Sequence, residues 1–137
     1  INPNRVVTLV RLLQLAPQIT IVCSNPGAKS LRNLLETKHP EALDQQINLL
    51  VMKGEETLDL GREHTLEFIP TPNPRYPDQL CTYDPRTEVM YTDKLFGAHV
   101  CGDQVLDEGW TVYGEDRRYY FDSVMAPYAR QVGVAID

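Results

Sequence analysis

The chain has 137 residues, of which 42% are hydrophobic and 23% charged, and its formal net charge is -6. These values are ordinary for one soluble globular domain with a single core. The charged residues are scattered, and no cluster of Lys and Arg alternates with aromatic residues, which argues against a nucleic-acid partner. No apolar run approaches the roughly 20 residues that span a bilayer, and the first residues lack a signal-peptide pattern.

The chain should begin with alternating helices and strands. Asn2-Pro3 predicts the start of a helix that Pro17 ends, and Ile19–Cys23 predicts an interior strand covered on both faces. Asn25-Pro26 repeats the cap and proline, so a second helix should run to about His39-Pro40. The apolar faces of the two helices comprise Val6, Leu9, Val10 and Leu13 in the first and Ala28, Leu31, Leu34 and Leu35 in the second.

A β-meander should follow the helices, because short apolar or alternating segments are separated by turn residues. Its strands are predicted at Ile47–Lys53, Thr57–Leu60 and His64–Ile69. Two further strands, Leu80–Tyr83 and Val89–Thr92, form a hairpin around Asp84-Pro85-Arg86-Thr87, which has type I turn residues. Pro70–Pro77 carries four prolines and should run as an ordered loop without ladder hydrogen bonds. This loop and Asp93-Lys94 should emerge at the same end of the hairpin.

The last third of the chain predicts a loop and a helix. Residues 96–115 are irregular, with Trp110 and Tyr113 as anchors, and residues 117–131 should form a final helix that Pro127 bends or interrupts. Three widely spaced cysteines indicate neither a disulfide framework nor a CxxC metal knuckle, so a reducing compartment fits best. Cys81 and Cys101 are interpreted as buried or incidental thiols, because no resolving thiol is adjacent.

Motifs for nucleotide binding, serine hydrolysis and zinc proteolysis are absent: the sequence has no GxGxxG, P-loop, GxSxG or HExxH. The three histidines are His39, His64 and His99, and none has a second histidine at chelating spacing. We therefore interpret them as exposed or hydrogen-bonded side chains.

Three segments, in this order, resemble the β-lactamase-like domain of flavodiiron proteins of the photosynthetic kind. That family has a His-Trp-Pro-Asp loop, a Thr-Tyr strand and a Ser-x-Asp-Ala-Phe-Gly segment. The equivalents here are Arg75-Tyr76-Pro77-Asp78, Thr82-Tyr83 and Thr92-Asp93-Lys94-Leu95-Phe96-Gly97. The resemblance covers nearly all of the chain. The family's first ligand cluster should lie upstream of Ile1 and its last ligand downstream of Asp137, so we expect a fragment.

The resemblance implies an α/β fold in which residues 1–137 form part of a metallo-β-lactamase-like αββα sandwich, one half of that domain. A half sandwich leaves an apolar sheet face uncovered unless other residues supply a cover. We therefore expect dimerisation or instability of the chain on its own.

In the family pattern, two iron ligands fall at Arg75 and Lys94. Neither is a metal ligand at neutral pH, and two cations there would repel iron. Asp93 lies one residue early, and in an extended segment its side chain should point to the opposite face. Arg75 and Lys94 are the candidate catalytic positions, with no metal held in this segment. They either replace the metals electrostatically, by binding acidic groups or a small anion, or are solvated surface charges.

Tyr76 occupies the place of the family's Trp, near the FMN of the facing subunit in a dimer. It either packs on the flavin or simply covers the Pro-rich loop. The resemblance implies a parent that reduces oxygen with electrons from a reduced nicotinamide cofactor or ferredoxin, using FMN and a diiron centre that is absent or degraded here. Partners would be the flavin domains of the same chain and another flavodiiron subunit.

The fragment alone should be inactive, and the cytoplasm or plastid stroma is its expected location. One alternative function is a non-catalytic scaffold of a flavodiiron assembly. A more distant alternative is a hydrolase of the wider β-lactamase-like superfamily, which would need an upstream histidine cluster and a nucleophilic water. Arg75 and Lys94 argue against the hydrolase as they do against the diiron site.

Overall fold

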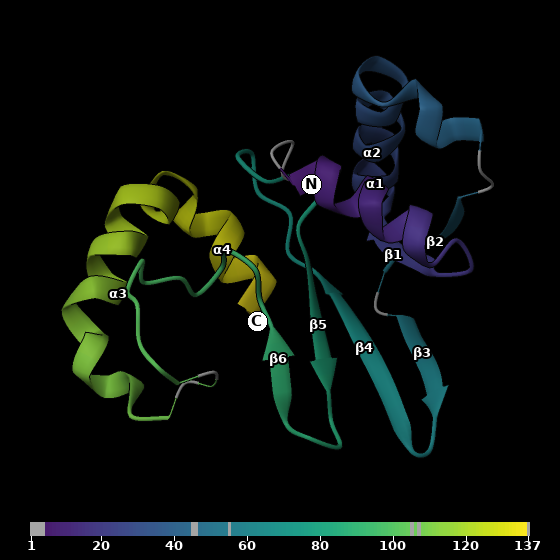
Figure 1. Ribbon diagram of the computed structural model, residues 1–137. Coiled ribbons are helices and arrows are strands. Elements are labelled where there is room, and N and C mark those ends of the chain that lie inside the picture. Colours follow the sequence, from purple (N-terminus) through teal and green to yellow (C-terminus); the bar gives the residue numbers. More distant parts are fainter. Residues whose placement is uncertain (1–4, 45–46, 55, 105, 107, 137) are drawn as a thin grey trace.

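The computed structural model describes residues 5–44, 47–54, 56–104, 106 and 108–136 (Figure 1). The predicted Asn2-Pro3 cap lies outside these residues. The first elements are α1 (Val6–Leu15), β1 (Thr20–Ser24), α2 (Asn25–Lys38), the 3-10 helix η2 (Pro40–Asp44) and β2 (Asn48–Met52). They confirm the expected alternation of helices and strands.

β1 and β2 form a parallel pair in which Thr20 lies opposite Asn48 and Ser24 opposite Met52. The two helices pack against this pair through the first of two hydrophobic cores, whose buried members are Val6, Val10, Leu31, Leu35 and Ala42. The expectation of an interior β1 is wrong for the described residues. β1 pairs with β2 alone there, so Thr20 is exposed and the middle of the strand is half-buried.

The N-cap of α2 is Ser24 rather than the predicted Asn25. The Ser24 hydroxyl accepts a hydrogen bond of 3.2 Å from the Gly27 N–H, and Pro26 lies in the first turn. The same hydroxyl donates to the backbone carbonyl of Asp78 at 2.9 Å. This bond joins the end of β1 to Asp78, which directly follows the Pro-rich residues 70–77.

The second sheet is an antiparallel meander in the order β3-β4-β5-β6. Its strands are β3 (Glu56–Gly61), β4 (His64–Pro70), β5 (Leu80–Asp84) and β6 (Val89–Tyr91). Asp84 closes the β5–β6 turn, since its carboxylate accepts from the Arg86 N–H and the Thr87 hydroxyl at 3.0 Å each. In the described part of the chain, β6 pairs with β5 alone.

The C-terminal region is helical from Trp110 to Ile136, which extends beyond the helix predicted over residues 117–131, and it is divided into several parts. Its parts are η3 (Trp110–Tyr113), α3 (Gly114–Tyr120), a π-helical turn η4 (Phe121–Met125), η5 (Ala126–Tyr128) and α4 (Ala129–Ile136). Pro127 lies in the irregular stretch, as expected of a residue without an N–H donor. The predicted anchors Trp110 and Tyr113 are half-buried and pack edge to face, with ring centroids 5.3 Å apart.

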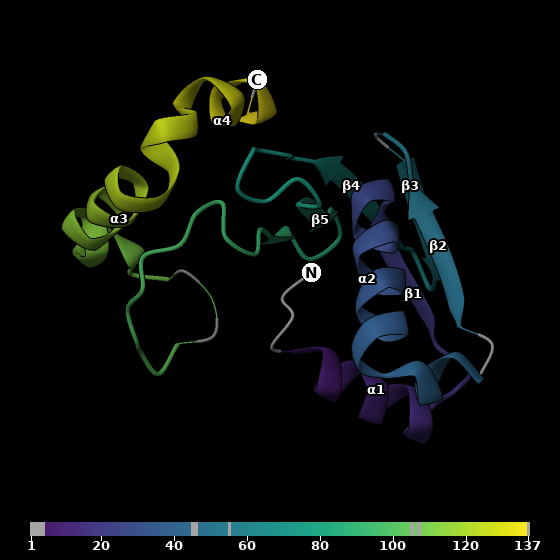
Figure 2. The same cartoon turned by 90° about the horizontal axis from the view of Figure 1, so that it is seen from above.

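These C-terminal helices pack on the meander and form the second core, whose buried members are Cys81, Leu95, Tyr120, Met125 and Val132. Both views place α1 and α2 with the β1–β2 pair at one side of the meander, and α3 and α4 at the other (Figures 1 and 2). No helix in the described part of the chain has the length and apolarity that crossing a membrane requires.

Candidate functional site

The Pro-rich segment between β4 and β5 forms a narrow hairpin extension, which corrects the expectation that it lacks ladder hydrogen bonds. The Thr71 N–H donates to the Gln79 carbonyl at 3.2 Å, and Asn73 and Tyr76 exchange two backbone bonds at 3.3 and 3.0 Å. Pro72 and Pro74 alternate with these residues and stand where no N–H donor is used. Alternation of this kind lets prolines occupy an antiparallel pair at little cost.

The hairpin extension and the segment after β6 meet at one aromatic ring. The guanidinium carbon of Arg75 lies 5.7 Å from the centroid of the Tyr76 ring, and Lys94 Nζ lies 4.9 Å from it. Both distances fall within the roughly 6 Å range of cation–π attraction. The structure thus brings together Arg75, Tyr76 and Lys94, the three residues that the sequence singled out.

Asp93 lies beside Lys94 rather than facing away from it. Its carboxylate is 2.7 Å from Lys94 Nζ, and its φ is 51°. The expected alternation fails because the segment is a turn, closed by a 3.1 Å bond from the Leu95 N–H to the Thr92 carbonyl. The charge of Lys94 is therefore balanced locally. Among the described residues, Arg75 has no carboxylate partner within salt-bridge distance.

Tyr76 does more than cover the Pro-rich loop, because it also packs against the second core. Its ring is half-buried, with two cations close to it. Apolar contacts with the second core thus hold the Tyr76 ring, and two positively charged groups lie close to it. Whether it contacts a flavin stays a prediction.

Tyr120 holds the segment after β6 from the side of the C-terminal helices. Its buried hydroxyl donates a 2.7 Å hydrogen bond to the Lys94 carbonyl. Burial raises the pKa of this phenol, and the nearby Tyr76 and Asp93 add to the rise while Arg75 opposes it. Gly97 allows the close approach, since a Cβ there would lie 2.8 Å from the Tyr120 ring. Sequence patterns alone do not indicate this role of Tyr120.

The described residues do not fit an iron site by themselves. Iron prefers nitrogen, carboxylate or thiolate donors, and the described part of the chain contains no group of three or more His, Cys, Asp and Glu side chains able to hold a metal. At the two positions where the family pattern predicts iron ligands, Arg75 and Lys94 carry a guanidinium and an ammonium, and the nearby Asp93 carboxylate is engaged by Lys94. Further ligands would have to come from other residues of a longer chain.

The histidines agree with their interpretation as exposed or hydrogen-bonded side chains. His39 lies 3.0 Å from Glu41, and His64 lies 3.0 Å from the Asp84 carboxylate. His99 is exposed and packs edge-on against the Tyr120 ring. Burial alone would raise the pKa of Asp84, but hydrogen bonds from His64, Thr87 and the Arg86 N–H outweigh it, so the pKa is lowered.

All three cysteines are free thiols. Cys23 and Cys81 are buried, and burial is the main cause that raises the pKa of each. Cys101 is exposed. This agrees with the interpretation of Cys81 and Cys101 as buried or incidental.

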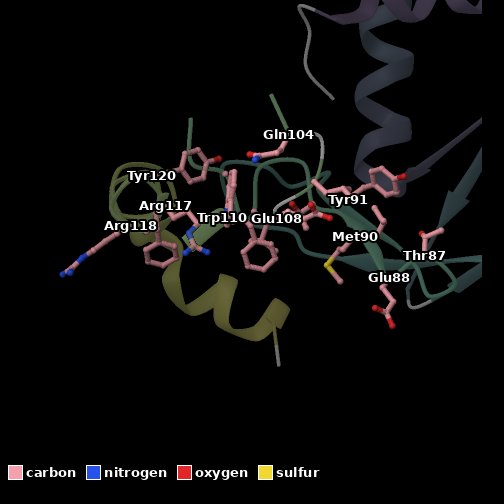
Figure 3. Close-up of a pocket in the computed structure, with 18 residues that line it drawn as sticks. Thr87, Glu88, Met90, Tyr91, Gln104, Glu108, Trp110, Arg117, Arg118 and Tyr120 are labelled. Carbon is pink, nitrogen blue, oxygen red and sulfur yellow. The ribbon is translucent and has the colours of Figure 1, made fainter. Parts of the chain in front are cut away.

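A cavity of about 1290 Å³ lies between β6 and the C-terminal helices (Figure 3). Met90 and Tyr91 line its sheet side, while Trp110 and Tyr120 line its helical side. Arg75, Tyr76 and Lys94 do not line it, so it is distinct from the cation cluster. The sequence did not reveal it, because it depends on how the helices dock beside the strand.

Comparison with known proteins identifies the chain's relatives, although no family model matches it. It is 65% identical over 137 residues to a protein of Nostoc sp. described as diflavin flavoprotein A 6, covering 100% of this chain and 23% of that protein. It is 63% identical over 139 residues to diflavin flavoprotein A 3 of Synechocystis sp., covering 100% and 22%. The chain thus spans about a quarter of the length of these curated relatives.

Two solved structures are similar over almost the whole chain. The metal-soaked flavodiiron core of Flv1 from Synechocystis sp. has a TM-score of 0.88 and 62% identity, covering 99% of this chain and 32% of that one. A fragment of diflavin flavoprotein A 5 from Nostoc sp. has a TM-score of 0.83 and 52% identity, covering 98% and 50%. The fold is therefore α/β, part of the metallo-β-lactamase-like αββα sandwich. Within that class, the chain belongs to the flavodiiron, or diflavin flavoprotein, family.

Proposed function

We propose that residues 1–137 are part of one metallo-β-lactamase-like domain of a flavodiiron oxidoreductase subunit in which basic residues stand at iron-ligand positions. The observation that carries this proposal is the convergence of Arg75 and Lys94 on the Tyr76 ring, from two separate segments. Scattered surface lysines and arginines would not be expected to share one ring. The family, the fold and the positions of these two residues support the proposal together.

In this proposal, Arg75 rather than Lys94 is the cation that binds an acidic group or an anion. Lys94 is already paired with Asp93, whereas Arg75 is exposed and has no carboxylate partner among the described residues. Its planar guanidinium, with a fork of N–H donors, suits a carboxylate or a small anion. We expect Arg75 to bind an acidic side chain of the remaining parent chain or an anion, and Lys94 to keep the local charge balanced.

The parent would carry electrons from a reduced nicotinamide cofactor or ferredoxin through FMN to oxygen. When bound, FMN would supply the electron transfer, and Tyr76 is the residue here that could pack near the FMN of a facing subunit. The parent would act as a homo- or hetero-oligomer with another flavodiiron subunit, in the cytoplasm or plastid stroma of a photosynthetic cell. This chain alone would not catalyse the reaction, because flavin-binding domains lie in other parts of such a parent.

The second candidate is a non-catalytic scaffold of a flavodiiron assembly. It is favoured by the same cations, since a subunit whose iron ligands are replaced can still assemble with a competent partner. The two proposals differ in flavin: an electron-transferring subunit retains FMN, whereas a pure scaffold does not need it. A metallohydrolase is less well supported, because the described residues offer no cluster of donors for its metal.

Metal and flavin content of the full parent chain tests the proposal. Elemental analysis and visible absorbance on one preparation should show FMN and far less iron than a full diiron complement. The double variant Arg75→His with Lys94→Asp should bind more iron, because it restores a nitrogen donor and a carboxylate.

The matched control is Arg86→His with Lys53→Asp, which makes the same changes away from the cluster and should leave the iron content unchanged. A full diiron complement in the wild-type protein would overturn the proposal. A protein without FMN and without iron would favour the scaffold.

A further inference from the structure

Two amide side chains beside the cation cluster are almost completely buried, although they belong to a short hairpin tip. Asn73 and Gln79 are each 5% exposed. Buried polar groups are costly unless their hydrogen bonds are made, and no buried side-chain polar atom among the described residues lacks a partner. These two amides are therefore bonded inside the protein, and their partners show what they hold in place.

Asn73 fixes the turn that carries Arg75 and Tyr76. Its Oδ1 accepts hydrogen bonds from the Arg75 N–H at 3.1 Å and from the Tyr76 N–H at 3.0 Å. An Asn side chain that binds N–H groups two and three residues ahead stabilises a tight turn. The directions of the Arg75 and Tyr76 side chains thus depend on this one oxygen.

Gln79 joins that turn to the segment that carries Lys94. Asn73 Nδ2 donates to Gln79 Oε1 at 3.4 Å, and Gln79 Nε2 donates to the Thr92 carbonyl at 3.4 Å. The Thr92 carbonyl also accepts the bond that closes the Asp93-Lys94 turn. A continuous path of hydrogen bonds, all through buried or half-buried groups, therefore runs from the Arg75 N–H to the turn of Lys94.

The path requires an amide at both positions. Each side chain accepts at one end and donates at the other, and among the side chains of this size only Asn and Gln do both without a change of charge. An acid at either position would keep the acceptor and lose the donor. The placement of Tyr76 and of the two cations thus depends on side chains that bind the backbone of their segments.

We propose that Asn73 and Gln79 are positioning residues, a buried amide relay that sets the placement of Arg75 and Lys94 on the Tyr76 ring. This inference rests on the proposed role of those two cations. It adds that their spacing is imposed by the hairpin tip and does not depend on a bound ion.

Lysine methyl resonances of the full parent protein can test the relay. Reductive methylation with isotope-labelled formaldehyde marks each lysine, and a methyl group above an aromatic ring resonates upfield. The Lys94 signal is identified by its loss in Lys94→Arg, and its upfield displacement should vanish in Tyr76→Leu. In Gln79→Met, which keeps the shape but removes both bonds, we expect most of the displacement to be lost.

Thr71→Val is the matched control, because it removes another buried hydrogen bond of the same hairpin, the 3.4 Å contact with Cys81, without touching the relay. It should leave the Lys94 signal in place. Gln79→Glu supplies a rescue: the carboxylate cannot donate to Thr92, but its protonated form can. The displacement should return in this variant as the pH falls through the pKa of the new carboxyl, which burial raises.

A Lys94 signal that keeps its displacement in Gln79→Met, while Tyr76→Leu abolishes it, overturns the relay and leaves the proposed function intact. A signal that Tyr76→Leu does not move means that the contact itself is absent, which overturns both. Loss of the displacement in Gln79→Met with a full diiron complement in the wild type keeps the relay and removes the proposed function.

Discussion

Lys94 is held in place mainly through its backbone. The cation–π contact with Tyr76 is worth about 0.5–1 kcal/mol at a partly exposed position, and the ion pair with Asp93 about 0–1 kcal/mol. Neither interaction is strong enough to fix the side chain by itself. The Tyr120 hydroxyl and the Gln79 amide bind the backbone on either side of Asp93. These bonds fix the backbone position from which the Lys94 side chain extends.

The Tyr120→Phe variant measures this backbone anchor. It removes a half-buried hydrogen bond to the Lys94 carbonyl, so we expect a loss of about 1–3 kcal/mol in the free energy of unfolding, because the carbonyl loses its partner. Urea unfolding of both proteins gives the difference. Tyr119→Phe is the control: Tyr119 is 76% exposed, and this change should have almost no effect.

The same tyrosine predicts a pH dependence. Its pKa is raised in the folded state, so its contribution to stability is complete below the unfolded value near 10.0 and is lost as the pH rises through the folded pKa. The wild type should therefore lose stability at alkaline pH more steeply than Tyr120→Phe. Equal slopes for the two proteins would contradict this role.

At the residue scale, the sequence predicted the participants of the cluster but not their supports. Arg75, Tyr76 and Lys94 were found because they stand in recognisable segments. Asn73 and Gln79 carry no such signal, since polar residues of a loop are usually exposed and their burial depends on tertiary contacts. The position of Asp93 was misjudged because its left-handed conformation is not visible in the pattern.

The C-terminal helices contact the segment that follows β6 at a point that leaves no room for a side chain. A Cβ at Gly97 would lie 2.8 Å from the Tyr120 ring. Gly97→Ala should therefore force the helices away from the segment that follows β6 and cost about 1–3 kcal/mol. Thermal unfolding should show a lower midpoint than that of the wild type.

Gly133→Ala is the control, and its expected effect on stability is the opposite. Gly133 lies within α4 and has no atom near the added Cβ, so the substitution should be neutral or stabilise by up to about 1 kcal/mol. If both alanine variants were equally stable, the docking contact at Gly97 would not have the importance assigned to it.

Elements with a clear period were predicted well. α1, α2 and the two strands of the β5–β6 hairpin lie where apolar spacing and turn residues place them. The sequence predicts that Pro127 bends or interrupts the C-terminal helix, but local patterns do not show the π-helical turn that precedes this proline. The N-cap was displaced from Asn25 to Ser24, since both residue types cap helices and tertiary contacts decided between them.

At the scale of the molecule, the meander ends in a strand edge with apolar residues next to it. Met90 is 45% exposed and Tyr91 63% exposed, and both lie along the cavity beside β6. We expect the 137-residue chain on its own to self-associate through this edge, because unpaired edges with apolar side chains promote strand pairing. Sedimentation velocity at increasing concentration measures the association.

Met90→Lys should reduce that association, since a charge on an edge strand opposes pairing. Val112→Lys is the control, because Val112 is exposed on η3 and does not line the cavity. Equal association of the two variants would point to a different surface.

The class of fold could be predicted from the sequence through the order of its motifs. The division into two sheets could not, because the pairing of β1 with a single strand in the described residues depends on which other strands are present.

The prolines of residues 70–77 also act on the unfolded chain. Four of these eight residues are prolines, and each has a nearly fixed φ, so the unfolded ensemble has fewer conformations to lose. Each proline stabilises the folded state by about 0.4–1 kcal/mol where its folded φ is compatible with the ring. The hairpin tip therefore starts out partly ordered, and this lowers the entropic cost of bringing Arg75 and Tyr76 to their places before any ligand arrives.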